Sequence, residues 1–421
     1  MTQFSFRSAL AATALAALSL PAQAADPAAI LKTYADIALA GYEDSLATAR
    51  ALDEAVHALV AEPGDDTLKA AREAWLAARP PYQQTEAFRF GNTIVDDWEG
   101  RVNAWPLDEG LIDYVDASYG TESDANSFYT VNVIANAQIA NGGETIDAST
   151  ITPGVLQSLQ EVGGIEANVA TGYHAIEFLL WGQDLHGTGA GAGERPASDY
   201  DTANCTGGHC DRRAQYLTAA SDLLVSDLEE MVGNWRQGGA ARAELMADPA
   251  RGVSAILTGL GSLSYGELAG ERMKLGLLLH DPEEEHDCFS DNTFNSHFYD
   301  VTGINNVYFG SYTRIDGSKV EGPSLAAYVR ETDAGVADEM EGKLKATMEA
   351  ATALKKRGET VEAYDQMIGE GNAEGNAAVQ AVIDGLVAQT RSLERVIAAL
   401  NAGDVTIEGS DSLDNPGAVF E

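Results

Sequence analysis

An imidazole and a carboxyl group stand three residues apart in segment 172–182, which is otherwise largely apolar. If the segment is helical, His174 and Glu177 share one face, because residues three apart lie one turn from each other. Charge in an apolar helix is costly unless it is paired or bound to a metal. The spacing therefore predicts a metal site in which His174 supplies nitrogen and Glu177 supplies oxygen. The alternative is a hydrogen bond between the two side chains that only orients the helix.

Segment 82–90 contributes a third candidate ligand. On a helix, Tyr82, Glu86 and Arg89 lie on one face. Glu86 can complete a metal shell, and Tyr82 and Arg89 would then orient the ligands. An ion pair between Glu86 and Arg89 is the alternative.

The second half of the chain holds further supporting candidates in segments 266–273 and 283–292. The first segment places two carboxylates one helical turn apart beside an arginine, and the second is dense in oxygen and imidazole groups. Either segment can complete the shell, although ion pairs on a helix and a solvated acidic loop explain them equally well. The supporting candidates are Glu267, Glu271, Glu285, His286 and Asp291.

The types of these groups indicate which metal and which chemistry to expect. Carboxylates with one or two histidines suit iron best, and zinc or calcium also fit. Zinc peptidases use His-Glu-x-x-His or His-x-x-Glu-His, whereas here Phe178 follows Glu177. The chain also lacks Gly-x-Ser-x-Gly, Walker and dinucleotide-binding motifs. We therefore expect metal binding rather than catalysis.

Three cysteines leave a second question open. Cys205 and Cys210 can close a short loop as a disulfide in an oxidising compartment. They can instead bind zinc with His209 and a distant ligand. Cys288 can be free or can pair with either of the other two.

The N-terminus predicts export. Residues 1–24 combine one basic residue, a short apolar stretch and a small-x-small ending, which is typical of a signal peptide cleaved after Ala24. No later segment is apolar enough to span a membrane. We expect an exported protein that is periplasmic in a cell with two membranes. The formal net charge of −39 argues against nucleic acid as a partner.

Apolar periodicity predicts an all-α fold of two bundle-like halves, a diverged internal duplication being one explanation of their shared order of elements. The predicted divisions are an N-terminal half, 25–200, a C-terminal half, 201–400, and an acidic, frayed tail, 401–421. Prolines 80 and 81 should break a helix that resumes through residue 90. The best strand candidate is 128–134. The longest expected helices are 30–60, 212–235, 252–279 and 372–400.

Taken together and in order, these motifs resemble the imelysin family. The resemblance includes its Gly-x-His-x-x-Glu signature at His174 and Glu177 and extends over nearly all of the chain after residue 24. One departure is Phe294 after Thr293, where relatives often carry a histidine, with His297 nearby. The matching stretches are 82–90, 103–109, 172–184, 210–213, 267–273 and 284–292.

The resemblance implies an all-helical fold with the signature near the interface of the two halves, and a link to iron uptake in the bacterial envelope. We therefore expect an exported protein of iron acquisition that binds a cation between its halves. An iron chelate or haem is an alternative ligand, and envelope iron-transport components are the expected partners. A metal-dependent peptidase, which is the family's label, and a non-catalytic envelope adaptor are the alternative functions.

Overall fold

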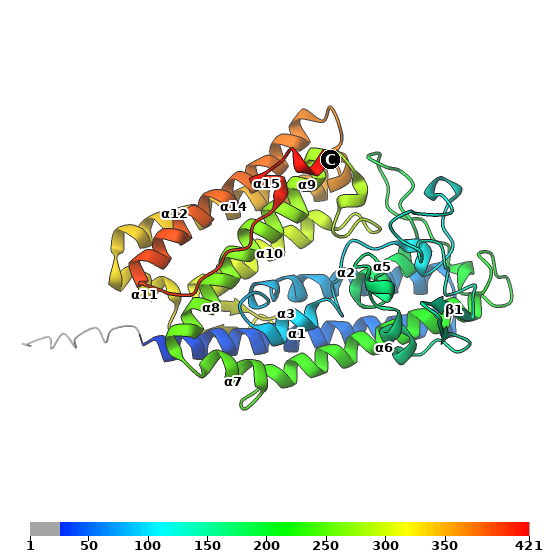
Figure 1. Ribbon diagram of the computed structural model, residues 1–421, viewed down its shortest axis with the longest axis horizontal. Coiled ribbons are helices and arrows are strands. Elements are labelled where there is room, and N and C mark those ends of the chain that lie inside the picture. Colours follow the sequence, from blue (N-terminus) through cyan, green and yellow to red (C-terminus); the bar gives the residue numbers. More distant parts are fainter. Residues whose placement is uncertain (1–25, 421) are drawn as a thin grey trace, which may run out of the picture.

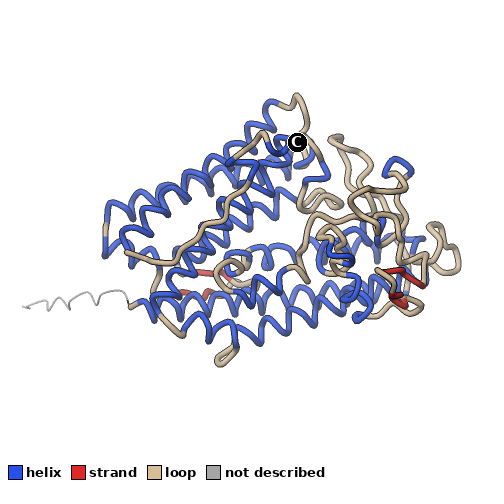
Figure 2. Tube along the Cα trace, in the orientation of Figure 1, coloured by secondary structure: helices blue, strands red, loops and turns tan. Residues whose placement is uncertain are grey.

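Helices make up most of residues 26–420, the part of the chain that this computed structural model describes (Figures 1 and 2). The mostly helical class predicted from the sequence is confirmed. The predicted signal peptide, residues 1–24, lies outside the described residues. Within residues 26–420, no helix has both the length and the apolar character needed to cross a membrane.

Long helices form a first layer along one side of the molecule (Figure 1). Helix α1, Pro27–Ala61, packs most extensively against α2, Asp65–Gln83, and α6, Cys210–Trp235. Asp26 caps α1 by accepting a hydrogen bond from the backbone of Ala28, and a proline follows at the first helical position. The shorter helices α3, Thr93–Glu99, and α7, Ala240–Met246, complete this layer. Because α6 belongs to it, the packing groups residues from both predicted halves.

A second layer crosses the first (Figure 1). Its longest helices are α12, Ala334–Thr360, and α14, Ala373–Leu400, which pack against each other. A rod of α8, Pro249–Ser262, η6, Leu263–Lys274, and α9, Leu275–Leu279, packs beneath them, and η6 has the wider turns of a π-helix. The remaining helices are α10, Thr293–Phe309, α11, Leu325–Thr332, and α13, Tyr364–Ile368.

The few strands form two antiparallel hairpins. One pairs β1, Gln138–Asn141, with β2, Glu144–Asp147, and the other pairs β3, Ser311–Thr313, with β4, Lys319–Glu321. The strand predicted at 128–134 is wrong, because that segment forms consecutive turns. Asparagine side chains at its ends accept hydrogen bonds from nearby backbone groups, which favours turns over a strand.

Two more expectations need correction. Prolines 80 and 81 do not break the helix, because they lie in the last turn of α2, which ends at Gln83 and is followed by the short turn η1, Glu86–Phe88. The tail is not frayed. Ser410 and Ser412 are buried against η6, and the Ser412 hydroxyl donates to the carbonyl of Gly270. The tail ends in α15, Asp411–Asp414, which also contacts η6.

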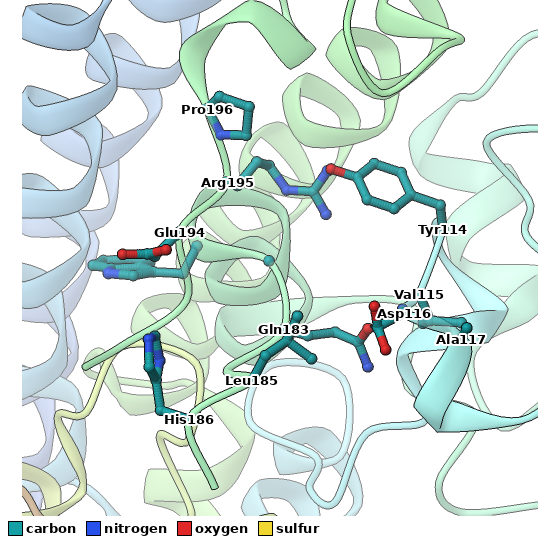
Figure 3. A pocket seen from close by; sticks show the side chains of 12 residues that line it. Tyr114, Val115, Asp116, Ala117, Gln183, Leu185, His186, Glu194, Arg195 and Pro196 are labelled. Atoms are coloured by element: carbon teal, nitrogen blue, oxygen red, sulfur yellow. Dashed lines mark hydrogen bonds between the residues drawn. The ribbon is translucent and has the colours of Figure 1, made fainter. Parts of the chain in front are cut away.

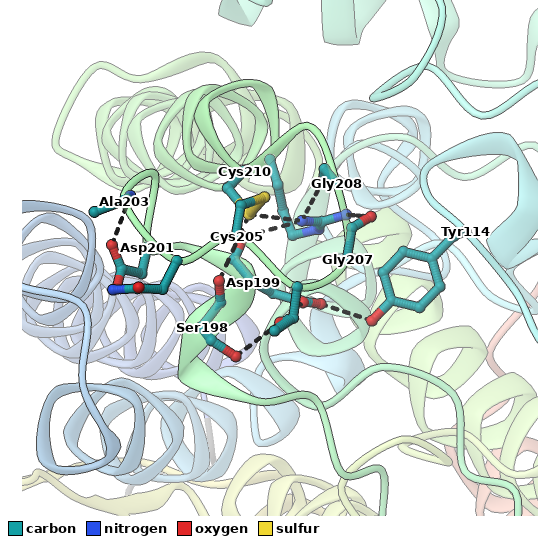
Figure 4. Close-up of a disulfide and its surroundings, with 12 residues drawn as sticks. Tyr114, Ser198, Asp199, Asp201, Ala203, Cys205, Gly207, Gly208 and Cys210 are labelled. Atoms are coloured by element: carbon teal, nitrogen blue, oxygen red, sulfur yellow. Dashed lines mark hydrogen bonds between the residues drawn. A yellow bond between two sulfur atoms is a disulfide. The ribbon is translucent and has the colours of Figure 1, made fainter.

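The cysteine question is settled at the start of α6. Cys205 and Cys210 form a disulfide across a five-residue separation (Figure 4). The Arg213 guanidinium donates to the carbonyl of Gly208 inside the disulfide loop. Cys288 takes part in no disulfide among the described residues. The loop therefore does not bind zinc through free thiolates.

Candidate metal centre

Helix α5, Gly172–Trp181, carries the histidine–glutamate signature through the centre of the protein, and all ten of its residues are buried. It begins at a glycine for two reasons. Gly172 has φ of +80°, and a Cβ atom there would lie 2.3 Å from the carbonyl oxygen of Val102. The next amide, of Tyr173, donates to the same carbonyl at 2.8 Å. This tight contact fixes where α5 starts and therefore where its side chains point.

The His174 ring is held by Glu177, one turn further along α5. Its Nδ1 atom lies 3.1 Å from Glu177 Oε2. The other oxygen, Oε1, accepts hydrogen bonds from the amide and the hydroxyl of Ser290, at 3.0 and 2.6 Å. Both carboxylate oxygens are thus engaged, and the ring is fixed in one orientation.

A second histidine reaches the same place from the loop before α10. His286 Nδ1 lies 3.1 Å from Asp287 Oδ1. The Arg79 guanidinium donates to both oxygens of Asp287, at 2.8 and 3.3 Å. Asn292 and Ser296 donate to Asp287 as well. Asp287 is therefore a fully occupied carboxylate that orients His286.

The two imidazole rings meet edge to face, with centroids 4.7 Å apart. Each ring leaves its Nε2 atom buried and without a hydrogen-bond partner among the described residues. Buried polar atoms are rarely left unpaired in native proteins, so two adjacent ones require an explanation. Potential ligand atoms of His174, His286 and Asp287 lie within 4.8 Å of one another. We call His174, Glu177, His286, Asp287 and Arg79 the histidine cluster.

Burial keeps both histidines neutral. It lowers the pKa of His174 to about 3. Burial, together with the charge of Arg272, lowers the pKa of His286 well below its usual range. Burial and the neighbouring charge of Asp287 raise the pKa of Glu177 well above its ordinary value. Neutral imidazoles can give their Nε2 lone pairs to a cation.

The donor set fits a transition metal. Imidazole nitrogen binds iron, zinc, copper and nickel. Metal-binding histidines usually donate their other ring N–H to a carboxylate, as Glu177 and Asp287 allow here at both rings. The open donors are the two Nε2 atoms. The role of Glu177 as a direct oxygen ligand stays a prediction, since its oxygens contact Ser290 and His174.

Glu86 lies elsewhere, in what we call the arginine network. Arg272 Nη2 contacts Glu86 at 2.7 Å, and the same guanidinium reaches Glu267 and Asp300. Arg89 connects Glu267 to a further acid, at 3.4 Å. The arginine network consists of Arg89, Arg272, Glu86, Glu99, Glu267 and Asp300.

The other supporting candidates lie in several environments. Tyr82 stacks against Tyr173 at 4.9 Å and lies under the Arg79 guanidinium. Glu271 is exposed on η6. Glu285 and Asp291 belong to a separate group of acids. Sequence reasoning missed the roles of Arg79, Asp287 and Ser290, although the His-Asp pair inside the flagged loop 283–292 was a usable signal.

A surface cavity of about 370 Å³ opens beyond the C-terminal end of α5 (Figure 3). Its lining includes Tyr114 and Arg195 on one side and Glu194 and His186 on the other. Arg195 is already paired with acids behind it, at 2.7 and 3.1 Å. The cavity therefore offers no free positive charge for an anionic iron chelate, and the histidine pair is not part of its lining.

Comparison with known proteins places this geometry in context. The model of a peptidase family described as imelysin matches residues 38–393. Iron-regulated protein A of Synechococcus elongatus is 34% identical over 76 residues, so the match spans 18% of this chain and 21% of that relative. A crystal structure described as a candidate iron-regulated protein A precursor from Parabacteroides distasonis shares the fold, with a TM-score of 0.60 at 18% identity, covering 89% of this chain and 94% of that one.

Proposed function

The chain belongs to the imelysin family, and we propose that this member is an exported protein of iron acquisition whose histidine cluster binds the metal. His174 and His286 would each coordinate iron through Nε2. Glu177 and Asp287 would hold the rings in the required tautomer. One observation carries the proposal, namely that both Nε2 atoms are buried and unpartnered within the described chain.

The choice of iron rests on two kinds of support. Nitrogen and carboxylate groups together suit iron. The curated relative and the solved relative both carry names that link them to regulation by iron. The acidic surface of a chain with a net charge of −39 would also concentrate cations around it.

Export is supported by the pattern of residues 1–24 and by the disulfide at Cys205–Cys210, because disulfides persist in oxidising compartments. The periplasm is the compartment we propose. Envelope iron-transport components are the proposed partners.

The contacts of Glu177 favour binding over peptide hydrolysis. A metallopeptidase needs an open metal position, a water and a free general base near a substrate cleft. Here both oxygens of Glu177 are engaged, and His174 is only 1% exposed. A polypeptide could not reach this site without a rearrangement. We therefore expect no cleavage of an unfolded polypeptide by the purified protein.

The test is an anaerobic Fe²⁺ titration of the chain without residues 1–24 after chelation, followed by elemental analysis. Wild type should bind one equivalent, and His174→Ala and His286→Ala should each lose at least tenfold in affinity. His57→Ala is the matched control, because His57 lies near two acids on the surface. Equal binding by all four proteins would overturn the proposal. A melting temperature unmoved by iron would favour the adaptor function.

A further inference from the structure

Beside the histidine cluster, three chain segments that are distant in sequence bring carboxylates together. Asp184 follows α5, Asp291 precedes α10, and Asp365 lies on α13. Potential ligand oxygens of these three residues lie within 4.8 Å of one another. Glu285 faces the same space, since it lines a cavity together with Asp184 and Asp365. We call these four residues the acidic cavity.

Acidic clusters are common on protein surfaces, but the side chains here are not solvated. Asp365 is 2% exposed and Glu285 is 1% exposed. Neither oxygen of either carboxyl group has a hydrogen-bond partner among the described residues, and the same holds for Asp291 Oδ1. Burying a carboxylate without a partner is strongly unfavourable. Five unpartnered acidic oxygens around one space therefore indicate a missing positive charge.

No side chain of the cavity supplies that charge. Among the described residues that line the cavity, none is a lysine or an arginine. The His186 ring contacts Asp184 from the exposed side, at 2.8 Å. The space that remains is about 10 Å³, which suits a single water molecule or ion and excludes an organic ligand.

We propose that the acidic cavity is a second cation site, separate from the histidine cluster, and that it takes a hard divalent cation, calcium. Carboxylate oxygens from several loops, in an adaptable arrangement, are the ligands that Ca²⁺ prefers. Mg²⁺ requires a smaller, regular octahedron and keeps its water more firmly. Cys288 also lines the cavity, but a thiol contributes little to binding of a hard cation.

The ligands come from segments that no other covalent link joins. A bound Ca²⁺ would tie the end of α5 to the start of α10 and to α13, and so would connect the two layers of the fold. Neutralising the cluster would also relieve mutual repulsion. Burial, followed by the charges of Asp291 and Asp184, raises the pKa of Asp365 to about 7, and burial with Asp184 raises that of Asp291 to about 6.

The test is calorimetric titration of the chelator-treated chain without residues 1–24 with CaCl₂ at roughly physiological ionic strength, where surface charges are screened. Wild type should show one saturable site and a melting temperature that rises with Ca²⁺. Asp365→Asn should weaken binding at least tenfold, whereas the exposed control Glu370→Gln should bind like wild type. Mg²⁺ should bind at least tenfold more weakly than Ca²⁺.

Loss of folding would not explain the expected loss of binding. Asp365→Asn removes a buried like charge, so without calcium it should melt at or above the wild-type temperature. Asp291→Asn provides a second variant, because Asp291 has φ of +57° and asparagine tolerates that conformation well. Unchanged Ca²⁺ affinity in both variants, absence of a saturable site, or equal affinity for Mg²⁺ would overturn the proposal.

The iron proposal and the calcium proposal fail separately. His174→Ala should lose iron and keep calcium, and Asp365→Asn should do the reverse. Loss of calcium binding in His174→Ala would contradict a separate site.

Discussion

The arginine network and the histidine cluster are both buried, yet they treat their polar atoms in opposite ways. Around Arg272, the guanidinium contacts three carboxylates, and the buried acids face positive charge. Around His174, two ring nitrogens face each other's surroundings with no partner in the described chain. The first arrangement is complete without a ligand, whereas the second is not.

The difference teaches how to separate structural charge from a binding site. Both regions contain acids one helical turn from another charged group, so the sequence pattern is alike. Burying a complete ion-pair network requires only good geometry and further hydrogen bonds. An incomplete cluster is maintained at a cost in stability, and such a cost is typical of functional sites. The predictions below either break this contrast or sharpen it.

The largest effect should come from removing the central cation of the arginine network. Arg272→Met would leave Glu86, Glu267 and Asp300 buried without compensation, and should reduce the free energy of unfolding by about 3–5 kcal/mol. Urea denaturation measures this loss. Arg395→Met, which breaks an exposed pair with Glu339, is the control and should cost little. A loss no larger than the control's would show that the network does not stabilise the fold.

Removing an imidazole should have the opposite profile. His286→Leu should lower iron affinity about 100-fold or more, because half of the open donors disappear. Its cost in stability without metal should stay below about 1.5 kcal/mol, since the replaced ring had an unsatisfied nitrogen. Iron titration and urea denaturation on the same sample check both halves. Severe destabilisation with normal iron binding would assign His286 to the scaffold.

A smaller effect is expected from the residue that orients His174. Glu177→Gln retains a carbonyl oxygen for Ser290 but loses the negative charge, and iron affinity should fall about 10–100-fold. Glu271→Gln, on the exposed face of η6, is the matched control and should bind iron like wild type. If both variants lose iron equally, general acidity rather than the signature explains binding.

The smallest effect concerns pH. The unfolded chain protonates His174 near pH 6.5, whereas burial delays protonation in the folded protein to about pH 3. Stability from this residue is therefore present above pH 6.5 and is lost as the pH falls through that window. Between pH 7 and pH 5, metal-free His174→Leu should lose about 1–2 kcal/mol less than wild type. Parallel pH profiles of the two proteins would contradict a buried neutral imidazole.

Periodicity and capping carry the long helices, which is why they could be predicted. The predicted helix 372–400 is observed as Ala373–Leu400, where the Asn372 side chain caps the first turn. The predicted 252–279 corresponds to the rod from α8 to α9. The π-turns of η6 inside that rod leave no trace in an apolar period, and neither does the docking of the tail against them.

The sequence could nominate the chemical groups but could not pair them. His174 with Glu177 is a local contact, so its spacing predicts it. The partner of Glu86 is 186 residues away, and His286 meets His174 only through the fold. Arg272 and Arg89 are alike in sequence, and only their positions show that Arg272 takes Glu86. Long-range pairing therefore decides which acids are free to bind a cation.

The central claim is that iron binds between the two unpartnered ring nitrogens, and anomalous diffraction at the iron absorption edge tests it most directly. Crystals soaked anaerobically in Fe²⁺ should show one dominant anomalous peak within coordination distance of both His174 Nε2 and His286 Nε2. A peak elsewhere in the molecule, with both rings unaltered and unliganded, would contradict the claim.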